Sequence, residues 1–207
     1  MAIIKHKEQR VGIFIDAQNL YHSAKNLHRG RVNFGNVLED ALAGRHLVRA
    51  IAYVITTETG EESGFFDALN KIGIETKTKD LQIFSSGSKK ADWDVGLAID
   101  AVKLASKLDV VVLASGDGDF VPLVEYLKMN GCQVEVITFG KSASGKLKEA
   151  ADDFVDLDED PGRYVMGGGH GSYTPRRGRN DRSERPESDK TNGAGATGGM
   201  RKVIRKI

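Results

Sequence analysis

The chain has 207 residues, enough for one domain of ordinary size, and 40% hydrophobic residues, enough for a buried core. Its longest apolar runs fall well short of the roughly 20 residues that a membrane helix needs, and residues 1–10 lack the apolar centre of a signal peptide. The single cysteine, Cys132, excludes an internal disulfide and a cysteine-based zinc site. We therefore expect a soluble, cytoplasmic protein with one folded domain and no membrane partner.

The formal net charge of +1 conceals two parts of opposite sign. Residues 161–207 hold 11 Lys and Arg against 4 Asp and Glu, a net of +7, which leaves −6 for residues 1–160. The C-terminal part also has ten glycines and almost no apolar residue before Val203, so it buries too little surface to offset its ordering entropy. We predict a domain over 1–160 and a disordered, basic Gly/Arg-rich tail over 161–207.

Apolar runs and helical spacings alternate along the first 157 residues. The runs predict strands at 11–15, 48–55, 109–114, 133–139 and 154–157, with shorter extended segments at 74–79 and 81–84. Helical spacing predicts helices at 19–27, around 38–42, and at 61–72, 93–108, 120–130 and 143–151. This alternation predicts an α/β, Rossmann-like fold, in which a mostly parallel sheet carries helices on both faces.

Acidic residues follow the predicted strands where a parallel sheet binds its ligands. Asp16 closes the first strand, and Asp117 and Asp119 follow the strand at 109–114. Asp94 opens the helix before that strand and is in line with the core-facing positions at +3 and +7. Four carboxylates at one rim repel one another unless a cation binds them, and Mg²⁺ or Mn²⁺ prefers such oxygen ligands. The pattern favours a divalent metal that activates water for attack on a phosphodiester.

Each residue also has a structural interpretation. Asp119, before a helix with Pro122 in its first turn, has the position of an N-cap, as has Asp92 before the preceding helix. Asn19 is placed either to cap the first helix or to bind Asp16 and a phosphate. Ser115 either orients a carboxylate or satisfies a strand end. The joint placement of the four acids favours the metal site.

Other phosphate-binding patterns fit less well. Haloacid-dehalogenase phosphatases need a second aspartate where Gln18 stands, and an integrin-like metal site needs a DxSxS pattern that DAQNL lacks. SGDGDF lacks the third glycine of a dinucleotide fingerprint. A Toprim-like enzyme needs a glutamate at position 16. The five histidines have no zinc-ligand spacing and are interpreted as ordinary surface or capping residues.

Three segments together resemble a known family. GIFIDAQNLYHS, KKADWDVGLAIDAV and SGDGDFVPLVEYLKMNGCQVEV resemble the NYN domain of LabA-like bacterial proteins, relatives of the PIN-domain nucleases, over residues 11–157. The resemblance implies a PIN-like fold and a metal-dependent ribonuclease site. Its motifs fall on Asp16 and Asn19, then on Lys90, Trp93 and Asp94 with Asp100 further on, and last on Ser115, Asp117 and Asp119.

Substrate contacts are expected from basic and hydroxyl residues at the same rim. Lys89 and Lys90 precede the acidic helix, and Lys141, Ser142 and Ser144 follow the next strand, where a helix N-terminus could bind an anion. Solvated surface lysines are the alternative. In the tail, Arg176, Arg177 and Arg179 with Tyr164 and Tyr173 resemble sequence-tolerant RNA-binding segments, with an inert solubilising extension as the alternative.

Two functions follow from these patterns. The first is a ribonuclease in which Asp16, Asp94, Asp117 and Asp119 bind Mg²⁺ or Mn²⁺, Asn19 positions the phosphate, and single-stranded RNA is the substrate. The second is a non-catalytic NYN-type regulatory module that binds nucleic acid or a protein. A homodimer is one possible oligomeric state.

Overall fold

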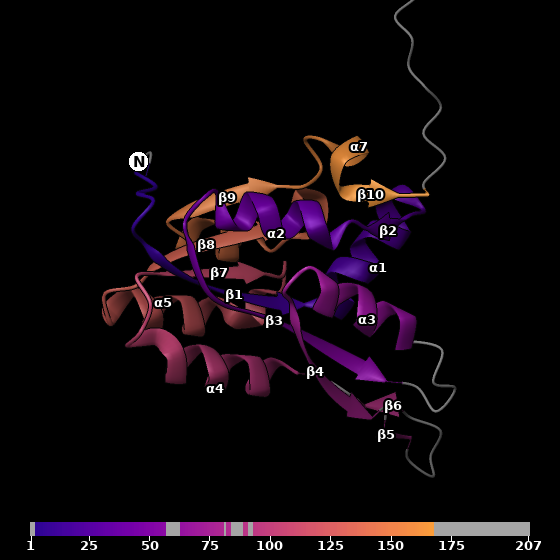
Figure 1. The fold of residues 1–207 in the computed structure, drawn as a ribbon, viewed down its shortest axis with the longest axis horizontal. Helices are drawn as coiled ribbons and strands as arrows, with labels where there is room; N and C mark the ends of the chain where they lie inside the picture. The colour runs from indigo at the N-terminus through magenta and orange to yellow at the C-terminus, as the bar shows by residue number, and fades with distance from the viewer. Residues whose placement is uncertain (1–2, 57–62, 81, 84–88, 91–92, 168–207) are drawn as a thin grey trace, which may run out of the picture. The chain divides into compact units, whose positions relative to one another are not determined.

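The computed structural model describes residues 3–56, 63–80, 82–83, 89–90 and 93–167, with the backbone alone for 82–83 and 89–90. Its centre is a sheet of six strands, all paired in parallel. In spatial order these are β4 Glu75–Asp80, β3 His46–Thr56, β1 Arg10–Asp16, β7 Val110–Ala114, β8 Gln133–Thr138 and β9 Asp153–Asp156. Figure 1 shows them side by side. The predicted α/β fold with a mostly parallel sheet is confirmed.

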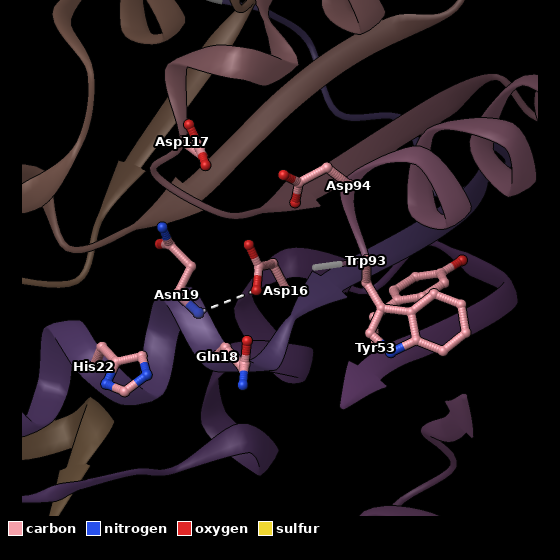
Figure 2. A pocket seen from close by; sticks show the side chains of 8 residues that line it. All are labelled: Asp16, Gln18, Asn19, His22, Tyr53, Trp93, Asp94 and Asp117. Atoms are coloured by element: carbon pink, nitrogen blue, oxygen red, sulfur yellow. Dashed lines mark hydrogen bonds between the residues drawn. The ribbon is translucent and has the colours of Figure 1, made fainter. Parts of the chain in front are cut away.

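The strand order reverses between β1 and β7. Numbered in chain order, the six strands follow the sequence 3-2-1-4-5-6, so the chain winds outward in one direction from β1 and in the other from β7. In open parallel sheets, ligands bind outside the carboxyl ends of the strands at such a switch point. Asp16 ends β1, and Asp117 follows β7 by three residues, so both stand at this point (Figure 2).

Helices cover both faces of the sheet. The buried apolar residues of α1 Ala17–His28, α2 Phe34–Leu42 and α3 Ser63–Lys71 belong to one apolar cluster. Those of α4 Asp94–Ala105, α5 Val121–Met129 and α6 Gly145–Ala150 belong to the other. Within the described ranges, no helix is both long enough and apolar enough to cross a bilayer.

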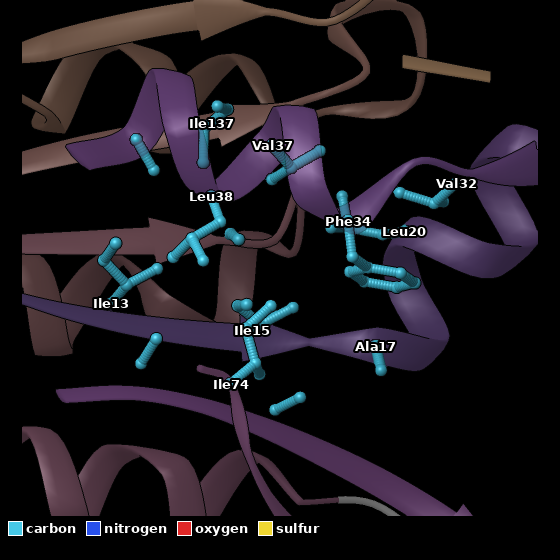
Figure 3. Packing of buried hydrophobic residues seen from close by; sticks show 14 of the residues in the cluster. Ile13, Ile15, Ala17, Leu20, Val32, Phe34, Val37, Leu38, Ile74 and Ile137 are labelled. Atoms are coloured by element: carbon cyan, nitrogen blue, oxygen red, sulfur yellow. The ribbon is translucent and has the colours of Figure 1, made fainter. Parts of the chain in front are cut away.

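The alternation of side chains along β1 explains why its apolar run is continuous. Val11, Ile13 and Ile15 enter the cluster under α1–α3, whereas Phe14 enters the cluster under α4–α6. Figure 3 shows Ile13 and Ile15 in the first of these clusters. All four are fully buried, because a central parallel strand has a covered face on each side. Between Arg10 at its start and Asp16 at its end, the strand therefore has no polar side chain.

The ends of several helices differ from their predicted positions. The first helix begins at Ala17 instead of residue 19, because the carboxylate of Asp16 accepts the backbone N–H of Asn19 and caps it. The fourth ends at Ala105, three residues early. A short 3₁₀ turn, η2 Gly140–Ser142, precedes α6, which starts at Gly145 instead of residue 143. Another, η1 Gly118–Phe120, precedes α5.

The predicted disorder from residue 161 onward is wrong for residues 161–167. These form α7 Pro161–Tyr164 and β10 Val165–Met166, and β10 pairs antiparallel with β2 Arg31–Val32. The hydroxyl of Tyr164 donates to Asp40 over 2.6 Å, and the Arg163 guanidinium binds the same carboxylate. These long-range contacts offset the entropy cost of ordering this segment, which the composition of the segment does not reveal. Residues 168–207 lie outside the described residues, so their disorder stays a prediction.

Candidate functional site

Asp16 is the most deeply placed acid at the switch point. Its Oδ1 accepts the backbone N–H of Asn19 at 3.0 Å, and its Oδ2 accepts the hydroxyl of Ser115 at 3.2 Å. Burial raises the pKa of Asp16, and the nearby charge of Asp117 raises it further, while hydrogen bonds from Asn19, Ser115 and the backbone of Gln18 lower it. The net effect is a raised pKa, so Asp16 holds a proton more tightly than a free aspartate does, and a nearby cation would stabilise its charged form.

The turn after β7 fixes the positions of three groups around Asp16. Ser115 is fully buried, and its Oγ also accepts the backbone N–H of Asp117 at 3.2 Å. The N–H of Gly116 donates to Asn19 Oδ1 at 2.9 Å. A Cβ on Gly116 would come within 3.1 Å of the Ala143 backbone, so only glycine fits this approach without a shift. The ends of β1 and β7 are thereby joined through side chains.

A pocket of about 230 Å³ opens above Asp16. Figure 2 shows the carboxylates of Asp16, Asp94 and Asp117 facing a common space, with Asn19 beside them. These three acids come from the end of β1, the first turn of α4 and the turn after β7. The pocket is lined by Asp16, Gln18, Asn19, His22, Tyr53, Trp93, Asp94 and Asp117.

Asp119 does not join these acids. Its side chain is exposed and lines a neighbouring hollow between α4 and α5, which Asp94 also lines. The N-cap prediction for Asp119 is wrong as well: its own N–H donates to Asp117 Oδ1 at 3.0 Å, so the Asp117 carboxylate caps η1. The 3₁₀ turn between the strand and α5 rotates Asp119 away from the pocket.

The four acids therefore do not form one chelate. Within the described part of the chain, no three His, Cys, Asp or Glu side chains are grouped closely enough to hold a metal ion. Asp16, Asp94 and Asp117 still offer hard oxygen donors to one space. Mg²⁺ is often bound by one or two carboxylates and retains several waters, so this donor set fits an ion held partly through water.

Two of the predicted substrate contacts are engaged elsewhere. The hydroxyl of Ser142 lies 2.8 Å from that of Ser23 and 3.2 Å from the Phe139 carbonyl oxygen, which ties the loop after β8 to α1. The backbone N–H of Lys141 donates to Asp158 at 2.8 Å, and its ammonium is 4.0 Å from the same carboxylate. Neither residue lines the pocket. Their loop is held by α1 and by the segment after β9.

The phosphate contact predicted at Lys90 and the helix cap predicted at Asp92 stay predictions. The backbone of β6 Lys89–Lys90 pairs with β5 Gln82–Ile83, but the Lys89 and Lys90 side chains lie outside the described residues, as does Asp92. Helix α4 begins after Trp93, which makes no side-chain cap hydrogen bond.

Asp100 has two partners on strands of the sheet. Its Oδ2 accepts the Tyr53 hydroxyl at 2.9 Å and the Lys77 ammonium at 2.6 Å. Burial raises the pKa of Asp100, but the bonds from Lys77 and Tyr53 outweigh it, so the pKa is lowered. Burial and the bond to Asp100 raise the pKa of Tyr53. Asp100 thus acts on the pocket only by holding Tyr53, which lines it.

Three pocket residues were missed by sequence reasoning. Gln18 and His22 project from the first two turns of α1, and Tyr53 pairs in register with Asp16 on the neighbouring strand. The spacing of Asp16, Asn19 and His22 by three residues was an available signal, because it places them on one helix face. Tyr53 gave no signal, since a tyrosine within a buried apolar strand has the pattern of a core residue.

Comparisons with a family model, with a related sequence and with a solved structure agree on the family of this chain. The model of the NYN domain family matches residues 10–158. The chain is 28% identical over 162 residues to "Low amplitude and bright protein LabA" of Synechococcus elongatus, which covers 74% of this chain and 86% of that protein. A crystal structure of a protein of unknown function from Vibrio parahaemolyticus is 30% identical, with a TM-score of 0.71 over 79% of this chain and all of that one. The chain belongs to the NYN domain family.

Proposed function

We propose that this chain is a metal-dependent ribonuclease that hydrolyses single-stranded RNA in the pocket between β1 and β7. One observation carries the proposal: a partly buried aspartate with a raised pKa, Asp16, faces Asp94 and Asp117 at the switch point of the sheet. Perturbed titratable groups in a cleft mark functional sites, and the NYN family is nuclease-like. Mutual repulsion of the three carboxylates is reduced when a cation binds between them.

The residues that would hold the ion are Asp16, Asp94 and Asp117, with Mg²⁺ or Mn²⁺ as the expected metal. A divalent ion bound there would supply an activated water and offset negative charge on the leaving oxygen. Asp119 could contribute only through water or after a rearrangement of η1, because its exposed side chain lines the neighbouring hollow.

The chain's own residues orient the acids and the phosphate. Ser115 and the N–H of Asn19 hold both oxygens of Asp16, so the carboxylate keeps one orientation. Because Asn19 Oδ1 accepts the N–H of Gly116, its amide NH₂ is the end that can donate to a phosphate oxygen. His22 adds an imidazole at the pocket wall, whose ring nitrogens are hydrogen-bonding groups.

The test is cleavage of a labelled single-stranded RNA with Mn²⁺, with and without EDTA. We expect cleavage that EDTA abolishes and that Asp94→Asn reduces by about two orders of magnitude or more, because the variant keeps the shape of the side chain and loses one charge. Asp67→Asn, on the exposed surface of α3, is the matched control and should retain activity. Equal cleavage by wild type and Asp94→Asn would exclude the assignment.

The second candidate is a regulatory NYN module that binds nucleic acid or a protein without catalysis. It is favoured by one observation: in the ranges that the structure describes, no three ligand-type side chains are preassembled for a metal. RNA that binds saturably and is recovered intact after long incubation with Mn²⁺ would support this candidate over the first. If the basic tail contributes to this RNA binding mainly through its charge, the affinity for RNA should fall steeply as the salt concentration rises.

A further inference from the structure

An indole occupies a position where local preferences disfavour it. Trp93 is the N-cap residue of α4, a place where Ser, Thr, Asp or Asn would satisfy a free backbone N–H, and it makes no such side-chain bond. Gly96 follows in the first turn of the same helix, although glycine is a residue type that destabilises a helix relative to alanine. Such conflicts between local preference and observed structure are expected at functional sites.

Gly96 is explained by the indole. A Cβ at position 96 would lie 2.6 Å from Cε3 and 2.9 Å from Cζ3 of Trp93, closer than such atoms approach. Only glycine at this position lets the indole lie back over the first turn of the helix. The chain thus accepts two unfavourable local choices, Trp93 and Gly96, to hold one aromatic ring in this place.

The indole is fixed in orientation by its other contacts. Its N–H donates to the Val54 carbonyl oxygen at 3.0 Å, and the Tyr53 ring packs against it edge-on, with centroids 5.5 Å apart. Its only hydrogen-bond donor therefore points to the sheet. What the ring offers to the pocket is apolar aromatic surface, which cannot bind a phosphate but can stack on a base.

The surroundings of the indole match those of a site for single-stranded nucleic acid. Trp93 lines the same pocket as Asp16, Asp94 and Asp117, and Figure 2 shows it beside Asp94. The Lys79 ammonium lies 5.8 Å from the ring centroid, so a cation stands next to the aromatic surface. Proteins that bind single strands without sequence preference combine stacking surfaces with cations near the backbone.

We propose that Trp93 is the stacking platform for a base of the bound RNA, next to the phosphate that Asn19 and an ion at Asp16, Asp94 and Asp117 would position. The proposal rests on the proposed function, since it names how that site holds its substrate. Trp93 is a binding residue in this role, and Gly96 is a positioning residue that acts through it.

The chain itself supplies the reporter, because Trp93 is its only tryptophan. The full chain with Mg²⁺ is mixed with a short oligouridylate, or with an abasic phosphodiester oligomer of the same length, and tryptophan emission is recorded on mixing, before turnover. We expect saturable quenching by the oligouridylate and little change with the abasic oligomer. Equal quenching by both, or saturable RNA binding without quenching, would overturn the proposal.

Substitutions give a second, independent measurement. Trp93→Leu should raise the RNA concentration for half-maximal cleavage about tenfold with little change in kcat, because a lost stack weakens binding. Trp93→Phe should retain most of the affinity, and Gly96→Ala should resemble Trp93→Leu, since its methyl group displaces the ring. Thermal unfolding checks that each variant is folded. An unchanged half-maximal concentration in folded Trp93→Leu would contradict the proposal.

Failure of this proposal differs from failure of the proposed function. Cleavage of RNA without any response of Trp93 would reject the stacking platform and leave the ribonuclease in place. Quenching by oligouridylate without cleavage would support the platform and reject hydrolysis, which is the result expected of the regulatory module.

Discussion

The hydroxyl of Ser115, at the end of β7, donates a hydrogen bond to Asp16 Oδ2, at the end of β1, across 3.2 Å. This bond joins the two strands at the switch point of the sheet and stabilises the charged form of Asp16. The same hydroxyl accepts the N–H of Asp117, so one fully buried side chain sets the relation between two of the three pocket acids.

Ser115→Ala should therefore raise the pKa of Asp16 further, because it removes a hydrogen bond that lowers it. We expect metal binding and cleavage to need a higher pH than in the wild type, and stability to fall by about 1 kcal/mol. The pH profile of Mn²⁺ binding, measured by calorimetry, checks the first effect. An unshifted profile would show that Ser115 does not control the charge on Asp16.

Asp16→Asn should abolish cleavage and stabilise the metal-free protein. Burial raises the pKa of Asp16 above its ordinary value of 3.8, so the folded state binds this proton more tightly than the unfolded chain. The charged carboxylate then costs stability above the raised pKa, and the cost is relieved as the pH falls through it. Asparagine caps a helix about as well as aspartate, so α1 keeps its cap.

Thermal unfolding measures this effect. At neutral pH without metal, Asp16→Asn should have the higher Tm, and the difference should shrink at acidic pH. Added Mn²⁺ should raise the Tm of the wild type and not that of the variant, because only the wild type binds the ion in its folded state. If Asp16→Asn has a lower Tm than the wild type in EDTA, the charge of Asp16 in the wild type is compensated within the protein.

The sequence predicts the central strands well and the short elements poorly. The apolar runs of β1 and β7 are unbroken because both faces of these strands are covered, and this pattern depends on local sequence. The strands β2 and β10 have two residues each and exist because they pair with each other from distant parts of the chain. No local pattern specifies such a pairing, and it is why the folded chain extends beyond residue 160.

The candidate site was likewise predicted in part: the sequence indicated which residues lie at the rim, but not which way their side chains point. Asp16 and Asp117 were predicted because acids after parallel strands share one rim, and Asp94 because of its helical phase. Asp119, Lys141 and Ser142 share the rim in sequence but are turned away by the 3₁₀ turns η1 and η2 and by contacts with other elements. The strand ends determine which residues lie at the rim, whereas the geometry of the turns after the strands determines which way their side chains point.

Asp109 should contribute stability that is lost in acid. Its carboxylate accepts the side chain of Arg10 at 2.8 and 3.1 Å and the Arg10 backbone N–H at 2.7 Å, which lowers its pKa from 3.8 to about 2. Because the folded pKa is lowered, the stabilisation is present above 3.8 and is lost as the pH falls toward about 2. Both side chains are about half exposed, so solvent screening reduces its size.

Urea unfolding of Asp109→Asn measures this contribution. We expect a loss of about 1 kcal/mol at neutral pH, and a smaller difference from the wild type at pH values near the lowered pKa. A difference that stays constant with pH would show that the charge of the Asp109 carboxylate does not stabilise the starts of β1 and β7.

The effect of burial on the strength of an ion pair can be tested with two Arg–Glu pairs of this chain, because both pairs have the same two side-chain types. Arg45 and Glu135 are fully buried and joined by two bonds of 2.5 and 2.9 Å, with Arg45 also donating to the Leu42 and Ala41 carbonyl oxygens. Arg49 and Glu75 form a similar pair between β3 and β4, but their side chains are substantially exposed. Loss of one partner leaves a buried charge in the first pair and a hydrated charge in the second.

Arg45→Met should therefore destabilise the fold by about 3 to 5 kcal/mol, whereas Arg49→Met should cost about 1 kcal/mol or less. The double variant Arg45→Met with Glu135→Leu should recover much of the loss, because it also removes the buried carboxylate, which among the described residues keeps only Lys5 at 3.2 Å and Gln133 at 2.6 Å once Arg45 is gone. Urea unfolding of the three variants measures these differences. Equal costs for the two single variants would mean that Lys5 or water compensates the charge of Glu135 once Arg45 is gone, so that burial in the folded state does not determine the strength of this pair.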